Sequence, residues 1–220
     1  MEKKLRTKDK ILQASIELFN SQGERQITTN HIAAHLGISP GNLYYHFRNK
    51  EDIVRHIFKE YAKLLENRIQ PPSKQSEALD ALAQYLDVVF ELMYRFHFFY
   101  ANLPDILSRD PALQQDYLVV QKGVQAKVVS VLQALKSAGV IAIADQDIPP
   151  FAQTVRLLVT FWISYLKTQA PHAQIDQSQA YQGVLKVLLL FKPYATEAAA
   201  PRIERLQQHY QQLAGPSILN

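Results

Sequence analysis

Residues 28–52 read TTNHIAAHLGISPGNLYYHFRNKED, and this stretch decides how the N-terminal part of the chain folds. It predicts a helix, a tight turn, a second short helix and a third helix with a capped start. Ser39 is a good N-cap for the short helix, and Pro40 fits its first position, where the missing N–H would be unpaired anyway. Leu43 and Phe47 give this helix one apolar face, but a helix of its length is not stable alone. The pattern is therefore typical of a helix-turn-helix, whose second helix packs on its neighbours and faces the DNA major groove.

The composition excludes several classes of protein. The chain has 220 residues, enough for a small domain and a larger one with its own core. It has no cysteine, which excludes disulfides, thiolate catalysis and cysteine-ligated metal sites. The longest uncharged apolar-rich run covers the ten residues 157–166, whereas a membrane span needs about 20. The basic N-terminus continues into a helical pattern that contains Glu17, unlike a signal peptide, so we expect a cytoplasmic protein without membrane segments.

The excess of positive charge lies in the N-terminal third of the chain. Residues 1–70 carry 12 Lys and Arg against 8 Asp and Glu, whereas residues 71–220 carry 12 of each. The formal net charge of +4 therefore falls in the segment with the helix-turn-helix pattern. An excess of this size also occurs on ordinary solvated surfaces, but its position suits a surface that binds phosphates.

Tandem prolines at 71–72 mark the expected boundary between two domains, because proline removes amide donors and cannot continue a helix. Before them, apolar spacing and caps predict four helices over roughly 7–22, 29–36, 40–46 and 50–69. We therefore expect a DNA-binding domain over residues 1–70, with 50–69 as its linking helix, and a second domain over 73–220.

The second domain also reads as helix throughout. Its expected helices cover residues 77–100, 102–108, 111–137, 150–168, 176–192 and 201–213. The first of these is apolar on nearly all sides, which is typical of a central buried helix. Alternating strand patterns and Asn-Gly hairpin signals are absent and glycine is scarce. The sequence thus predicts an all-α fold, with an N-terminal three-helix helix-turn-helix domain and a larger C-terminal helical domain for effector binding and dimerisation.

The N-terminal segment resembles the TetR/AcrR-type transcriptional repressors over residues 7–58. Twelve residues fall where the signature of that family places them, with the same spacing: Thr28, Ile32, Ala33, Gly37, Ser39, Gly41, Leu43, Tyr44, His46, Phe47, Lys50 and Glu51. The order of elements after residue 72 is similar to the C-terminal half of that family in architecture only. The resemblance implies a homodimeric repressor with a DNA-binding domain and a C-terminal domain that senses a small molecule.

The residue types in the helix-turn-helix suggest how it contacts double-stranded DNA. The expected DNA-binding residues are Thr28, Thr29, Asn30, Ser39, Pro40, Gly41, Asn42, Tyr44, Tyr45, His46 and Lys50. Hydroxyl groups at the starts of the two helices suit phosphate oxygens. So does Lys50, because a cation at the start of a helix gains nothing from the helix dipole. The family resemblance implies that Tyr44 and His46 clamp the DNA backbone.

Three side chains are candidates for reading bases. These are Asn30, Asn42 and Tyr45, because an amide pairs bidentately with adenine and an aromatic edge contacts a thymine methyl group. Gly41, which has no side chain, lets the helix approach the duplex closely. For each DNA-facing residue the alternative is an ordinary solvated side chain, and for Tyr44 it is packing against the first helix.

A single small helix-turn-helix rarely supplies enough contacts, so we expect a two-fold dimer on a palindromic operator. Two apolar stripes form the candidate interface: Val155, Leu158, Val159, Trp162 and Tyr165 on one helix, and Val184, Val187, Leu188 and Phe191 on another. Paired across a two-fold axis, two such helices make a four-helix bundle, as the resemblance also implies. The alternative is that both stripes face only the core of their own chain.

An effector needs a cavity, and the aromatic-rich segment that begins at residue 90 offers adaptable apolar walls. The candidate pocket residues are Phe90, Met93, Tyr94, His97, Phe98 and Arg156. Arg95, His97 and Arg156 would suit an anion and Glu91 a cation, so the pattern favours a lipophilic or aromatic effector, with a carboxylate as one option. The alternative is that these aromatic residues are simply core.

The patterns predict a DNA-binding protein and not an enzyme, and the family resemblance implies a sequence-specific, ligand-responsive transcriptional repressor. The chain contains no HExxH, no GxSxG and no glycine-rich phosphate loop, and its seven histidines are scattered. His31 and His35 lie four apart and could hold a metal, but a solvated surface is the better interpretation. We expect no metal and no cofactor. The alternative function is a DNA-binding dimer without an effector: a constitutive regulator, an activator or an architectural factor.

Overall fold

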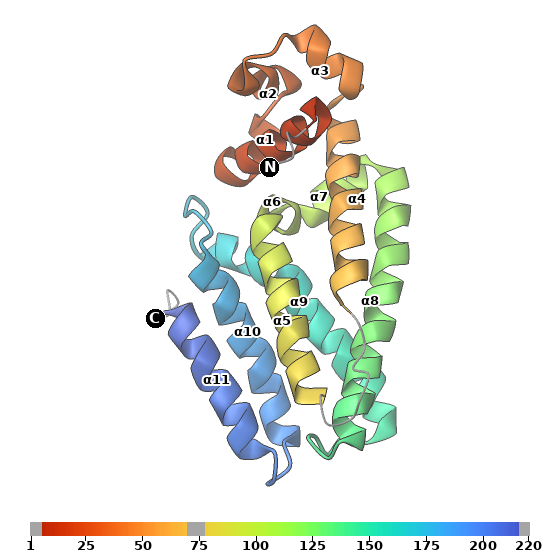
Figure 1. Cartoon of the computed structure of the whole chain (residues 1–220), viewed down its shortest axis with the longest axis vertical. Helices are drawn as coiled ribbons and strands as arrows, with labels where there is room; N and C mark the ends of the chain where they lie inside the picture. Colours follow the sequence, from red (N-terminus) through yellow and green to blue (C-terminus); the bar gives the residue numbers. More distant parts are fainter. Residues whose placement is uncertain (1–5, 70–77, 216–220) are drawn as a thin grey trace.

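The computed structural model describes residues 6–69 and 78–215, which form a small N-terminal helix bundle above an elongated helical body (Figure 1). The bundle contains α1 (Thr7–Gln22), a 3-10 turn (Glu24–Gln26), α2 (Thr29–Leu36), α3 (Pro40–His46) and the start of α4 (Lys50–Arg68). These bounds confirm the four helices predicted over 7–69. The predicted domain boundary at Pro71–Pro72 lies outside the described residues.

Side-chain caps and a shared core explain why these helices form. Thr28, Ser39 and Asn49 each accept a backbone N–H from three residues further on, at 3.3, 3.2 and 2.8 Å, which satisfies donors that helix starts leave unpaired. Gly37 ends α2 in the left-handed conformation, with a φ of 64°. The core of the bundle contains the fully buried side chains of Ile11, Phe19, Ile32, Leu43, Phe47 and Ile53. Tertiary packing therefore holds the short α3 in place, as its length requires.

The body consists of α5 (Ala78–Arg95), α6 (His97–Ala101), α7 (Leu103–Arg109), α8 (Pro111–Ser137), α9 (Ile148–Gln169), α10 (Gln177–Phe191) and α11 (Ala200–Ala214). Helix α4 descends from the bundle beside α5 and α8, while α10 and α11 close the opposite side (Figure 1). Outside helices and turns, the described residues contain an isolated β-bridge between Ile141 and Ala195 and no sheet, which confirms the all-α fold. Within the same ranges, no helix combines the length and the apolar character needed to cross a membrane.

The prediction of a single helix over residues 77–100 is wrong, because the helix is interrupted at Phe96. This residue has a φ of −113° and a ψ of 32°, which ends α5 at Arg95 and starts α6. The side chain of Asn20, near the end of α1, donates to the Arg95 carbonyl and accepts from the Phe98 N–H, both at 2.9 Å. The break is thus stabilised by a residue far away in the sequence, which a local apolar pattern cannot show. The other predicted body helices are confirmed, with ends that shift by at most two residues.

Candidate nucleic-acid interface and effector cavities

Helix α3 lies at the far end of the N-terminal bundle (Figure 1), and several of its side chains are exposed. Tyr45 is 85% exposed, Tyr44 is 50% exposed, and Asn42 is exposed as well. On the opposite face of the same helix, Leu43 and the following Phe47 are buried in the bundle core. A large aromatic side chain that stands almost entirely in water contributes little to packing, so its exposure favours contact with an external partner.

Hydroxyl groups gather at the starts of α2 and α3. The Tyr44 hydroxyl is hydrogen-bonded to Thr29 Oγ1 at 3.0 Å, which ties α3 to the first turn of α2. Thr28 and Ser39 use their oxygens as cap acceptors, and each hydroxyl keeps its own proton to donate. The two helix starts therefore offer O–H and N–H donors of the kind that bind phosphate oxygens.

Gly41 has no intramolecular reason to be glycine. Its φ is not positive, and a Cβ built on it would meet only Ser39 Oγ, at 3.9 Å. Glycine inside a helix costs up to about 1 kcal/mol relative to alanine. Gly41 thus lowers the stability of α3 without relieving a clash within the molecule. This favours the interpretation that glycine is needed here so that the helix can approach a partner closely.

The remaining helix-turn-helix candidates lie around this face. Asn30 is exposed on α2, and Pro40 is exposed at the first position of α3. The half-buried His46 ring stands edge-on to Tyr45, with ring centroids 5.1 Å apart. His31 completes the cap of α2, because its ring nitrogen accepts the Thr28 N–H at 3.3 Å. His31 thus has a structural role that the sequence interpretation missed.

The structure corrects the argument made for Lys50. Its ammonium lies 3.0 Å from Glu24 Oε1 and donates to the Glu24 carbonyl at 2.9 Å. The Glu24 side chain is only 1% exposed, so the cation has an internal partner at the start of α4. The inference that a phosphate best explains Lys50 was therefore wrong, and its contact with DNA stays a prediction.

Further ion pairs connect the bundle to the body. Arg109 of α7 pairs with Glu24 at 2.7 Å and with Asp105 at 3.1 Å, and Asp105 also pairs with Arg25. Hydrogen bonding to the Arg25 guanidinium holds the pKa of Asp105 below its ordinary range. The Arg25–Asp105 and Arg109–Glu24 pairs join residues 80 and 85 positions apart, so the sequence carries no local signal for them.

The six residues predicted to line one effector pocket do not come together. Phe90 and Met93 are fully buried, whereas Tyr94 is partly exposed. His97 and Phe98 line a cavity at the junction with α1, and Arg156 lines different cavities beside α8.

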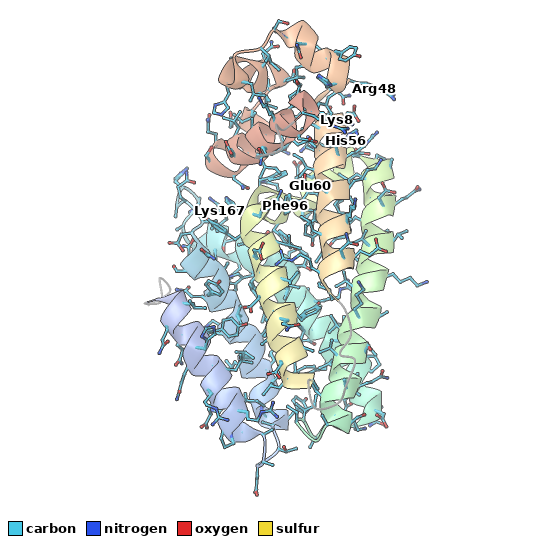
Figure 2. All side chains as sticks on the ribbon, viewed as in Figure 1. Lys8, Arg48, His56, Glu60, Phe96 and Lys167 are labelled. Carbon is cyan, nitrogen blue, oxygen red and sulfur yellow. The ribbon has the colours of Figure 1, made fainter. Side chains whose placement is uncertain are left out.

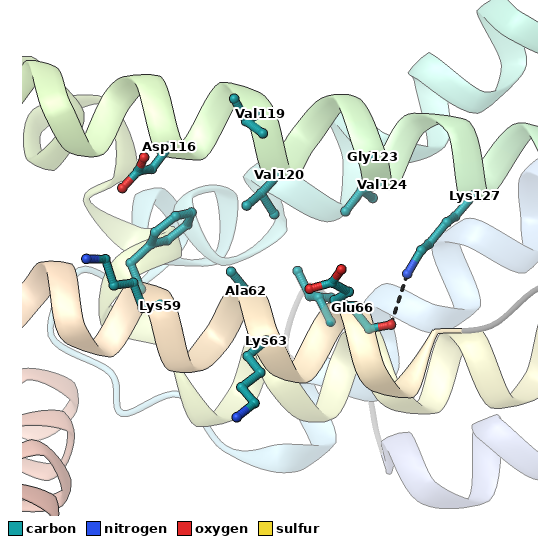
Figure 3. Close-up of a pocket in the computed structure, with 12 residues that line it drawn as sticks. Lys59, Ala62, Lys63, Glu66, Asp116, Val119, Val120, Gly123, Val124 and Lys127 are labelled. Atoms are coloured by element: carbon teal, nitrogen blue, oxygen red, sulfur yellow. Dashed lines mark hydrogen bonds between the residues drawn. The ribbon is translucent and has the colours of Figure 1, made fainter.

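An open groove runs between α4 and α8 (Figure 3). It has a volume of about 490 Å³, within the range of roughly 300–1,000 Å³ for small-molecule sites. Its walls are mostly apolar, and its charged side chains are Lys59, Lys63, Glu66, Asp116 and Lys127. Lys127 reaches across to the end of α4, where it donates to the Glu66 and Ile69 carbonyls at 3.1 and 2.9 Å.

A smaller cavity of about 30 Å³ lies deeper, between α4, α5, α8 and α9. Leu65 and Val124 line both the groove and this inner cavity, so these two side chains lie between them. The inner cavity is rich in tyrosine hydroxyls, and those of Tyr61 and Tyr100 are hydrogen-bonded at 2.6 Å. Burial raises the pKa of both phenols, so both stay neutral at physiological pH.

Arg156 is the charged group of this inner cavity. One guanidinium nitrogen donates to Gln125 Oε1 at 2.9 Å. Its Nε is buried and has no hydrogen-bond partner among the described residues. A buried donor without a partner is costly, so Arg156 is prepared to bind an acceptor from outside.

Six of the nine residues predicted for the dimer interface lie instead in the core of their own chain: Val155, Trp162, Val184, Val187, Leu188 and Phe191. Trp162 is 5% exposed, and its ring N–H donates to the Gln179 carbonyl at 2.8 Å. Leu158 and Val159 are partly buried, and Tyr165 is exposed.

An apolar stripe of α9 that shares Tyr165 with the predicted interface faces outwards. It consists of Leu157, Phe161 and Tyr165, four residues apart and 60%, 41% and 47% exposed. On the neighbouring α10, Leu189 is exposed and Leu185 is partly buried. Helix α9 is apolar on two sides, and periodicity alone does not show which side faces the core.

Comparisons with known proteins agree with this architecture. Residues 11–57 match the family model described as bacterial regulatory proteins of the tetR family, and residues 60–203 match TetR, described as a bacterial transcriptional repressor. The biofilm operon icaADBC negative regulator IcaR of Staphylococcus aureus is 34% identical over 98 residues, which are 44% of this chain and 53% of IcaR. The chain thus spans about half the length of that relative.

Two further proteins match over most of their length. The repressor KstR2 of Mycolicibacterium smegmatis is 26% identical over 185 residues, covering 83% of this chain and 88% of KstR2. The crystal structure of a TetR-family regulator from Marinobacter aquaeolei has 39% identity and a TM-score of 0.83. That match covers 94% of this chain and 99% of the other.

Proposed function

Because the chain belongs to the TetR family of bacterial transcriptional repressors, we propose that it is a homodimer that binds a palindromic operator and is released by a small lipophilic effector. The observation that carries this proposal is the uncovered face of α3, with Tyr45 85% exposed on a helix whose other face is buried. A regulator of this kind works where the chromosome is, so we place the protein in the cytoplasm. Selection of bound duplexes from a random pool tests the proposal.

The contacts with DNA divide into two kinds. Thr28, Ser39 and the Tyr44–Thr29 hydroxyl pair hold phosphates and set the position of α3, without reading sequence. Asn42 and Tyr45, both exposed on α3, reach base edges in the major groove. Gly41 lets the helix come close enough for them to do so. His46 and Asn30 supplement these contacts at the flanks.

The homodimer uses the outward stripe of α9 together with the exposed side of α10. Leu157, Phe161 and Tyr165 present apolar surface that a monomer would leave in water. With Leu189 on the adjacent helix, they supply the apolar centre that stable interfaces need. Two copies joined here make a four-helix bundle and present two α3 helices to successive turns of DNA.

We expect Phe161→Glu to convert the dimer into a monomer, because it places two like charges near a two-fold axis in an apolar patch. Operator affinity should fall in parallel, since each half-site would then bind alone. Light scattering after size-exclusion chromatography measures the mass. The matched control is Leu118→Glu on α8, also an exposed apolar residue, which should leave the dimer intact. A dimeric Phe161→Glu protein would place the interface elsewhere.

The effector site joins the α4–α8 groove to the inner cavity. Movement of Leu65 and Val124, which lie between the two, would create a pocket with apolar walls and a polar inner end. There Arg156 and the tyrosine hydroxyls offer hydrogen-bond donors to a carboxylate or carbonyl group. We therefore assign a lipophilic effector with a polar acceptor at one end.

Helix α4 couples this site to DNA. It contributes Leu65 to the pocket and begins within the N-terminal bundle, so an effector that separates α4 from α8 would reposition α3. A ligand shifts the equilibrium only by its difference in affinity for the two states. Coupling of about 1–3 kcal/mol is usual for such regulators and would suffice.

Arg156→Ala is expected to weaken effector binding by about 10- to 100-fold, the value of a hydrogen bond to a charged group. The measurement is release of a labelled operator on titration with dodecanoate, a carboxylate with an apolar tail. Arg202→Ala on the exposed side of α11 is the matched control. Equal sensitivity of both variants to dodecanoate would show that Arg156 does not contribute to effector binding. Failure of dodecanoate and of longer amphiphiles to release the wild type would favour a regulator without an effector.

A further inference from the structure

A separate cavity lies where the N-terminal bundle meets the body. We call it the junction cavity; it has a volume of about 370 Å³ and is lined by the end of α1, by α6, by the end of α9 and by residues 171–174. Figure 2 shows Lys167 at this level, at the top of the body and below the bundle. The junction cavity shares no lining residue with the groove or the inner cavity.

Lys167 is a cation without a carboxylate in this cavity. Among the described lining residues there is no Asp or Glu, whereas Lys167, His97 and His172 all line the cavity. The Lys167 ammonium donates to the Ala173 carbonyl at 2.6 Å, which leaves it further N–H donors. Burial lowers the pKa of Lys167, and no acidic neighbour opposes that shift. A partly buried ammonium in such surroundings favours an anion as its missing partner.

The His97 ring has an unusual arrangement of partners. Its Nδ1 lies 2.7 Å from the Tyr94 carbonyl, and its Nε2 lies 3.3 Å from the Asn20 carbonyl of α1. A neutral imidazole donates from one nitrogen only, so one carbonyl then faces a lone pair. Burial lowers the pKa of His97, and the charge of Lys167 adds to that effect, although the two carbonyls oppose it.

We propose that the junction cavity binds a small oxyanion, a carboxylate or phosphate of metabolite size, through Lys167. This site is additional to the effector site proposed above. The bound anion neutralises Lys167 and so favours a His97 ring that donates from both nitrogens. Of the groups that face this ring, Lys167 from α9 carries charge, whereas Tyr94 from α5 and Asn20 from α1 do not. The added hydrogen bond to Asn20 ties α1 more firmly to α6, so the anion fixes the DNA-binding bundle on the body.

The test is calorimetric titration of the full chain with inorganic phosphate and, separately, with succinate, in the absence of DNA. We expect wild type to bind phosphate, succinate or both. The titrant that binds shows whether the site prefers a phosphate or a carboxylate. Lys167→Met should lower that affinity by about tenfold or more, since it removes a charge-assisted hydrogen bond. Lys167→Arg should retain binding, and the exposed Lys192→Met on the body is the matched control.

Two results would overturn the proposal. One is the absence of binding by wild type at millimolar phosphate and succinate, and the other is a Lys167→Met protein that binds as well as wild type. Should Lys167→Met fail to fold, the side-chain amide NMR signals of wild type, recorded during the titration, show whether the anion binds in the junction cavity. Those of Asn20 and Asn102, which line the cavity, must move on titration, whereas that of Asn67 on α4 must not. Because the measurement contains no DNA, its failure is distinct from failure of the operator-binding proposal.

Discussion

Gly183→Val is expected to lower the free energy of unfolding by about 3 kcal/mol or more, which is at the upper end for an overpacked core. A Cβ at this position of α10 would lie 2.4 Å from Phe90 Cε1 and 2.8 Å from Trp162 Cδ1. Both rings are buried and Trp162 is also held by its hydrogen bond to Gln179, so neither can move away cheaply. Thermal unfolding followed by circular dichroism should show a midpoint lower by roughly 6–12 °C or more.

Gly123→Ala is the matched control, because it changes a helical glycine in open space. A Cβ on Gly123 of α8 would meet nothing within 4 Å. Alanine should therefore stabilise the protein by about 0.5–1 kcal/mol. Equal and small changes for both variants would mean that α10 does not pack against α9 and α5 as closely as the structure shows.

Loss of DNA binding by α3 variants is the second large effect that we expect. Tyr44→Ala removes the hydroxyl that is paired with Thr29 and should weaken binding to all sequences together, by roughly tenfold or more. Asn42→Ala should instead relax the preference at one base pair in each half-site, by about 1–3 kcal/mol. The difference follows from the proposed roles, since a phosphate contact carries no sequence information and a base contact does.

The control for these variants is Asn67→Ala, an exposed asparagine at the far end of α4. Its affinity and sequence preference should equal those of wild type. Binding is measured by gel shift with the selected operator and with single-base variants of it. An Asn42→Ala protein with an unchanged base preference would show that Asn42 does not read sequence.

Local features of the fold could be predicted from the sequence, because each depends on a few adjacent residues. The cap at Ser39, the proline at the first position of α3 and the end of α2 at Gly37 are examples. The helix-turn-helix needs such signals at nearly every boundary, and its helices were predicted within one residue. Exposure of Tyr45 also followed, since Leu43 and Phe47 define the buried face.

The features that sequence did not reveal depend on contacts between distant residues. The break at Phe96 requires Asn20, and the environment of Lys50 requires Glu24. The inward orientation of Trp162 also depends on a distant residue. Helix α9 has two apolar sides, and Gly183 of α10 leaves the space into which the side that carries Trp162 packs. Apolar spacing records that a side chain can be buried, not which helix will bury it.

The connection between the bundle and the body also emerged only from the structure. The Glu24–Arg109 pair, the Asn20 contacts and the junction cavity all lie at this boundary. A change in the body can therefore reach α1 as well as α4. If the effector site and the anion site proposed above are correct, this arrangement gives two routes by which a bound molecule would alter the position of α3.

The most direct test of the central claim is selection of bound duplexes from a random-sequence pool by the 220-residue chain. We predict enrichment of an inverted repeat whose half-sites lie about one turn of DNA apart, bound by one protein dimer. The same selection with Asn42→Ala should lose information at one position in each half-site. Absence of any enriched sequence, or binding that is equal for all duplexes and vanishes with salt, would contradict a sequence-specific repressor and leave phosphate attraction alone.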